Sequence, residues 1–137
     1  MEKKVLTDNK HYLLAVNVEK NRAYLKIKGY WRNVDAVPQY VGDWKKAVGL
    51  LKRGFTLLTD ATEMKTHPQD VRKLHEEAQS VLMKAGVVRI AELVKDDIAE
   101  IQLDAVAKVS AFPKKNFRDA AQAEQWLDEV LADGSAA

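Results

Sequence analysis

Apolar positions recur with two different periods along this chain, and the first third of the sequence predicts a β-hairpin. Residues 12–18 are apolar and rich in strand-forming side chains. Residues 22–30 alternate, with Ala23, Leu25 and Ile27 on one side and Tyr24, Lys26, Lys28 and Tyr30 on the other. Lys20-Asn21 between the two runs forms a tight turn, since Asn tolerates positive φ. The second strand is predicted to be half-exposed.

Helical spacing then alternates with short apolar runs. The predicted elements are a helix over 38–51, a strand over 55–59, a helix over 68–85, a strand over 87–94, a helix from Asp97 to a break at Phe112-Pro113, a small strand over 116–118 and a helix capped by Asp119. Gly54 and Gly86 are helix stops. The two last helices are expected to bury Ile98, Ile101, Ala105, Val106 and Val109, and Ala123, Trp126, Leu127, Val130 and Leu131, respectively.

The resulting order, β-β-α-β-α-β-α-(β)-α, predicts an α/β fold with a mixed four- or five-stranded sheet covered by helices. In such sheets ligands gather just past the carboxyl ends of the strands. The stretch that meets this description is residues 54–68, where a buried strand ends in a carboxylate and leads through a hydroxyl-rich loop to a helix start. We therefore place the candidate ligand or modification site there, at Asp60, Thr62, Lys65, Thr66 and His67.

Two further residues are candidates for a pocket or an interface beside that loop. Trp31 lies in the connection after the second predicted strand, and tryptophan is favoured at interfaces. Met64 lies within the loop itself. Trp44, by contrast, fits the apolar stripe of its helix and is predicted to lie in the core.

Length and composition limit the classes of function. The 137 residues are expected to form one domain over 1–131, with a frayed tail over 132–137. The absence of cysteine excludes disulfides and thiolate metal sites, and fits a cytoplasmic location. The 22 basic and 20 acidic residues give a formal charge of +2, which provides no argument for nucleic-acid binding. No apolar run reaches the ~20 residues of a membrane span.

Several landmarks carry a resemblance over residues 11–131. They are the opening hairpin, Gly54–Asp60 (GFTLLTD), residues 85–94 (AGVVRIAELV) and residues 117–127 (FRDAAQAEQWL). In this order they resemble the STAS fold, the SpoIIAA-like fold of anti-sigma-factor antagonists, in a poorly characterised bacterial branch. A looser similarity links the fold to CRAL-TRIO lipid-transfer domains. The resemblance implies a regulatory module, or alternatively a ligand-binding one.

STAS antagonists are phosphorylated on a Ser or Thr at the start of the helix after this strand, within an Asp-Ser-Ser-Gly-like motif. The comparable stretch here is Met64–Pro68, in which Thr66 matches the hydroxyl position. Lys65 stands where an acidic residue is expected, and His67-Pro68 replaces the small pair. The residues themselves also match a capping box, in which Thr66 is the N-cap and Gln69 bonds back to it. An anion site at the helix N-terminus is a third interpretation.

The remaining chemistry-bearing residues have structural interpretations. His67 and His75 are eight residues apart near the start of the predicted helix, which places them about 80° apart in projection and about 12 Å apart along the axis, too far to share a metal. His75-Glu76-Glu77 then forms a solvated helix flank. Arg89 is either an edge-facing charge or a cleft cation. Lys108, Lys114, Lys115 and Arg118 form a basic cluster that we interpret as a solvated loop.

No nucleophile elbow, phosphate loop or dinucleotide fingerprint is present in the sequence. We therefore expect no cofactor, no metal and no catalytic residues, although Asp60 is a possible general base. The sequence favours a non-enzymatic regulatory or protein-interaction module that binds a protein or a second copy of itself. The alternative is a binder of a small apolar or anionic ligand near residues 60–68.

Overall fold

A computed structural model describes residues 3–65, 67–110 and 113–132 of the chain. Its centre is a sheet of six strands that lie side by side in chain order. The strands are β1 (Lys4–Asp8), β2 (Tyr12–Asn17), β3 (Arg22–Gly29), β4 (Thr56–Met64), β5 (Arg89–Leu93) and β6 (Lys114–Phe117). The α/β class and the mixed sheet predicted from the sequence are confirmed, with more strands than expected.

The first three strands pair antiparallel, and β3 to β6 pair parallel. The turn between β2 and β3 contains Asn21 at a φ of 53°, as its tolerance of positive φ predicted. The strand that the sequence did not reveal is β1. Its residues, Lys-Val-Leu-Thr-Asp, are mostly polar because β1 is an edge strand whose outer side is unpaired.

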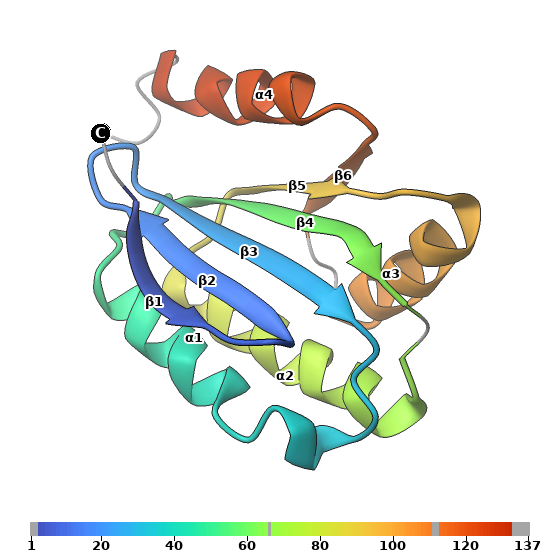
Figure 1. The fold of residues 1–137 in the computed structure, drawn as a ribbon. Coiled ribbons are helices and arrows are strands. Elements are labelled where there is room, and N and C mark those ends of the chain that lie inside the picture. Colours follow the sequence, from blue (N-terminus) through green and yellow to red (C-terminus); the bar gives the residue numbers. More distant parts are fainter. Residues whose placement is uncertain (1–2, 66, 111–112, 133–137) are drawn as a thin grey trace.

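Helices cover both faces of the sheet unequally (Figure 1). On one face lie α1 (Tyr40–Gly49) and α2 (Gln69–Ala85), preceded by a short 3-10 helix, η1 (Val34–Ala36), and α3 (Asp97–Ser110) packs beside α2. On the other face lies α4 (Ala120–Ala132), over β4, β5 and β6. In the described part of the chain, no helix is long and apolar enough to cross a membrane.

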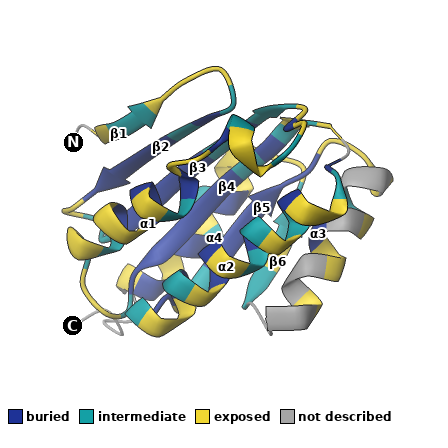
Figure 2. Cartoon of the chain, turned by 90° about the horizontal axis from the view of Figure 1, so that it is seen from below, coloured by how far each residue is buried: buried dark blue, intermediate teal, exposed yellow. Residues whose placement is uncertain are grey.

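The principal core lies between the sheet and the pair α1 and α2 (Figure 2). Trp44 is 1% exposed there, which confirms its predicted place in the core. The helix stop at Gly86 is also confirmed, because this residue adopts a φ of 96° after the last turn of α2. The largest apolar side chains of this core are Trp31, Trp44, Tyr12, Tyr40, Phe55, Leu14, Ile27, Leu57 and Ile90.

The second face of the sheet carries a smaller core and corrects one prediction. Tyr24 of β3 is 7% exposed and packs with Leu58, Ala91 and Leu127. Arg22, on the same side of β3, is completely buried. The second strand of the hairpin is therefore mostly buried rather than half-exposed, since α4 lies against that face.

Two large apolar residues of the predicted helical stripes are exposed instead of buried. Ile101 of α3 is 68% exposed and Leu131 of α4 is 39% exposed, so neither lies in the core. Among the α3 residues whose side chains the structure describes, Leu103 is buried. Asp119 caps α4 as predicted, since its Oδ1 accepts the Ala121 N–H at 2.8 Å. Of the predicted break at Phe112-Pro113, Phe112 lies outside the described residues.

Candidate functional site

The candidate segment begins as a strand rather than as a loop. β4 continues through Met64, four residues beyond Asp60, and residues 63 and 64 still pair with β3 after a bulge. Asp60 pairs with β3 on one side and β5 on the other. Its Oδ1 accepts the N–H of Thr62 at 2.9 Å and the Thr62 hydroxyl at 2.6 Å. The predicted loop over 61–64 is thus wrong, because the pairing with β3 outlasts the apolar run.

The start of the following helix also differs from its prediction. The N-cap position of α2 is Pro68, whose own side chain makes no capping hydrogen bond. The capping box with Thr66 as N-cap is therefore two residues too early, and Thr66 itself lies outside the described residues. Lys65 is exposed, and its backbone N–H donates to the Gly29 carbonyl at 3.0 Å.

The end of β3 turns Trp31 into the core. Gly29 adopts a φ of 63°, a left-handed conformation that glycine accepts without strain. Trp31 then lies with none of its surface exposed, and its Nε1 donates to the His11 carbonyl at 2.9 Å. The expectation that Trp31 lines an interface or a pocket is wrong, since its whole ring is packed. Met64 is half-buried and contacts two core clusters.

His67 and His75 lie together beneath the segment. His67 Nδ1 lies 3.0 Å from His75 Nε2. The two rings stack with their centroids 5.2 Å apart and an interplanar angle of 6°. Trp31 stacks on both rings, at 4.9 and 5.0 Å between centroids. The predicted separation is wrong because His67 precedes the helix, where the 100° spacing of helical residues does not apply. His75 is 7% exposed and so is not part of a solvated flank.

Burial controls the charge of this pair. It lowers the pKa of His67 to about 4 and that of His75 to about 3, with a further lowering of the second by the neighbouring His67. Both rings are therefore neutral at pH 7, and one donates its N–H to the other. Among the described residues, no three His, Cys, Asp or Glu side chains are grouped to hold a metal.

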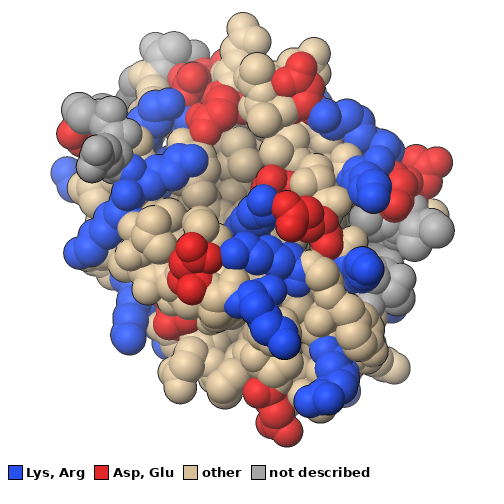
Figure 3. All heavy atoms as spheres, viewed as in Figure 1, with Lys and Arg blue, Asp and Glu red and all other residues tan. Residues whose placement is uncertain are grey.

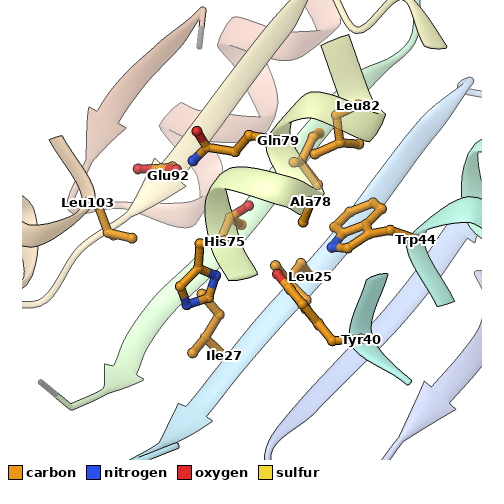
Figure 4. A pocket seen from close by; sticks show the side chains of 12 residues that line it. Leu25, Ile27, Tyr40, Trp44, His75, Ala78, Gln79, Leu82, Glu92 and Leu103 are labelled. Atoms are coloured by element: carbon orange, nitrogen blue, oxygen red, sulfur yellow. The ribbon is translucent and has the colours of Figure 1, made fainter. Parts of the chain in front are cut away.

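A cavity of about 30 Å³ lies between α2 and the sheet, next to His75 (Figure 4). Its lining contains the polar residues Thr59, His75, Gln79 and Glu92 and the rings of Tyr40 and Trp44, and its remaining walls are aliphatic. Figure 4 shows Gln79 pointing from α2 toward Glu92 on β5. The volume suits one or two water molecules and is far below the ~300 Å³ of a small-ligand pocket.

A buried ion pair lies on the far side of the same cavity. Lys114 Nζ is 2.9 Å from Glu92 Oε1 and also contacts Asp104. Burial raises the pKa of Glu92. It would lower the pKa of Lys114, but Glu92 and Asp104 reverse this and raise it. Lys114 is 8% exposed in its side chain, so the predicted solvated basic cluster is wrong for this residue. Arg89 stacks on Trp126 and pairs with Glu129, which fits neither predicted role fully.

The outer surface around the candidate segment is mixed in character. Tyr30, one residue before the buried Trp31, is 52% exposed. Lys26 pairs with Glu63 at 2.6 Å, and Lys28 pairs with Asp8 at 2.9 Å. On the face drawn in Figure 3, basic and acidic side chains are interleaved over the sheet rather than separated by sign. Such a surface offers paired charges and one aromatic ring.

The sequence did not single out Asp43, which is 8% exposed on the inner side of α1. Its Oδ2 accepts the Tyr12 hydroxyl at 2.5 Å and the Thr7 hydroxyl at 2.8 Å. A signal was present, because Asp43 stands three residues after Tyr40 and four before Ala47. An acid on the apolar stripe of a helix indicates a buried polar contact.

The sheet order, the helices on both faces and the position of the β4 segment define a SpoIIAA-like fold, as the resemblance implied. An uncharacterized DUF3478-family protein with this fold from Shewanella loihica PV-4 is similar, at a TM-score of 0.63 and 15% identity over 88% of this chain and 97% of that one. SiaC of Pseudomonas aeruginosa is similar at a TM-score of 0.56 and 11% identity, over 85% and 100%. No family model and no curated protein matches the sequence.

Proposed function

We propose that this chain is a non-enzymatic, regulatory protein-interaction module. Its contact surface comprises Tyr30, Thr62, Glu63 and Lys65. One observation carries the proposal: the segment after Asp60 is presented outward on a strand, while Trp31 and His67 beneath it are packed solid. A firm surface with an exposed tyrosine suits a protein partner, because tyrosine gives a large contact area at little entropic cost.

The alternative, a small ligand held near residues 60–68, has weaker support. The rings of Trp31 and His67, which would form the walls of such a pocket, are stacked on each other with their centroids 4.9 Å apart. The neighbouring cavity of about 30 Å³ admits only water-sized molecules. The fold similarity to SiaC and to the DUF3478 protein is compatible with a regulatory role.

A photocrosslinking amino acid at Tyr30 tests the proposal in the native host. We expect a discrete adduct, either with another protein or with a second copy of the chain, identified by mass spectrometry. The matched control places the same amino acid at Lys45, which is exposed on the outer side of α1. Equal adducts at both positions, or none at Tyr30, would refute the proposed surface.

A further inference from the structure

A second feature lies apart from that surface, at the same end of the sheet but on the α1 side. A cleft of about 350 Å³ opens between the β1–β2 turn and the start of α1. This volume is within the range of small-ligand sites, roughly 300–1,000 Å³. The cleft is lined by Thr7, Asn9, Tyr12, Ala36, Val37, Pro38, Gln39 and Asp43.

Asp43 gives this cleft a negative charge, and only one of its two carboxylate oxygens accepts hydrogen bonds from the described residues. Both hydroxyl donors, from Thr7 and Tyr12, bond to the same oxygen, Oδ2. Oδ1 receives no hydrogen bond from the residues that the structure describes. No lysine or arginine among those residues forms an ion pair with Asp43. A buried carboxylate without a cation strongly favours a positively charged partner.

The neighbouring charges do not supply that partner. Lys28, beside the β1–β2 turn, is bound by Asp8 Oδ1 at 2.9 Å and by the Asn9 carbonyl at 3.0 Å. Lys10, an exposed cation within that turn, forms no ion pair with Asp43 in the described part of the chain. Burial and the bond to Asp43 raise the pKa of the Tyr12 phenol, so this group stays a neutral donor. Asp35, on the exposed side of η1, adds a second negative charge near the rim.

We propose that this cleft binds a small aliphatic primary amine in its ammonium form. The ammonium would donate a charge-assisted hydrogen bond to Asp43 Oδ1, whose orientation Thr7 and Tyr12 fix in advance through Oδ2. The short alkyl body would lie against Ala36, Val37 and Pro38. The carboxylate excludes anions, and the ammonium distinguishes the ligand from an alcohol of the same shape.

The test is an NMR titration of the ¹⁵N-labelled chain with n-butylammonium chloride, against sodium chloride at the same ionic strength. We expect saturable shifts of amides lining the cleft, with half-saturation at millimolar concentration (about −4 kcal/mol). Butan-1-ol should produce no saturable shift there. Asp43→Asn should weaken binding at least about tenfold, since one charge-assisted bond is lost.

Two further variants complete the design. Asp35→Asn removes the same charge from the exposed rim and should change the affinity less than about twofold. Ala36→Leu narrows the cleft without touching Asp43 and should weaken binding about tenfold. It decides the matter if Asp43→Asn fails to fold. Shifts that never saturate, equal binding of butan-1-ol, or unchanged binding by a folded Asp43→Asn would each overturn the proposal.

Discussion

The two faces of the sheet are stabilised in different ways. Against α1 and α2 lies a broad core that contains Trp31, Trp44 and Phe55, all at most 1% exposed. Against α4 lies a small apolar cluster, and beside it the buried Arg22, which bonds Glu124 and Asp128 of that helix. The first face depends on apolar area and the second on ion pairs that fix where a single helix sits.

The largest expected effect breaks the broad face. Trp31→Ala removes the ring that stacks on both histidines and should cost about 3–5 kcal/mol of unfolding free energy. Tyr30→Ala is the matched control. The Tyr30 side chain is next to Trp31 in sequence but is 52% exposed, so we expect its removal to change the unfolding free energy by no more than about 0.5 kcal/mol. Urea denaturation followed by circular dichroism measures both, and similar midpoints for the two variants would contradict the placement of Trp31.

The next largest effect concerns the face of the sheet that α4 covers, and it is tested by removing either Arg22 or its two carboxylate partners. The double variant Glu124→Ala with Asp128→Ala leaves the buried Arg22 without its carboxylates and should cost about 3 kcal/mol. Arg22→Met should cost less, because the two carboxylates left behind are 30% and 48% exposed and water can solvate them. The same denaturation series gives both values. If Arg22→Met is the more damaging, the electrostatic account of this face fails.

Acid should weaken the broad face specifically. Both buried histidines have folded pKa values, about 4 and about 3, below the 6.5 of the unfolded chain. At a pH between the folded and the unfolded pKa of each histidine, the unfolded state therefore binds more protons than the folded state. The stability that the pair contributes is complete above pH 6.5 and declines as the pH falls toward 4 for His67 and toward 3 for His75. The slope is at most about 1.4 kcal/mol per pH unit for each histidine.

The measurement is the urea midpoint between pH 7 and 4.5. The double variant His67→Phe with His75→Phe keeps the aromatic stack and removes both titrating rings, so its decline should be much shallower. His11→Gln, outside the pair, should stay much closer to the wild type than the double variant does, because burial and then Lys10 lower the pKa of His11 as well, but this side chain is only partly buried. Identical pH dependence in the wild type and the double variant would show that other groups control acid stability.

The smallest effect concerns the proposed contact surface. Thr62→Val removes the hydroxyl that donates to Asp60 at 2.6 Å and should cost about 1 kcal/mol. Thr62→Ser keeps the donor and should stay close to the wild type. Thermal unfolding compares the two. A loss in Thr62→Ser as large as in Thr62→Val would mean that the methyl group matters, and not the bond to Asp60.

Periodicity made the helices and the central strands predictable, because their apolar faces meet broad partners. It failed where contacts depend on the third dimension. The alternation of β3 looks half-exposed until α4 supplies Glu124 and Asp128 for Arg22. Likewise, the approach of His67 to His75 depends on the chain path before α2, which helical spacing does not describe.

The candidate segment shows the same division. Its location after a buried strand followed from the sequence, since that strand is apolar and ends in Asp60. Its form did not, because pairing with β3 is decided by backbone register and carries the strand to Met64. Asp43 was missed for a related reason: its hydroxyl partners, Thr7 and Tyr12, are more than 30 residues away in sequence.

The strand order has a consequence for assembly. Because the six strands lie in the sheet in the order of synthesis, each new strand finds its neighbour already formed and pairs at its edge. The last helix is different. The partner of Arg22, Glu124, follows it by 102 residues, so their ion pair forms only after α4 has packed on the sheet. Before that step, Tyr24 and Leu58 are exposed to water. A chain in which α4 has not yet packed has a nearly complete sheet with one exposed apolar face, which is the form most prone to aggregation.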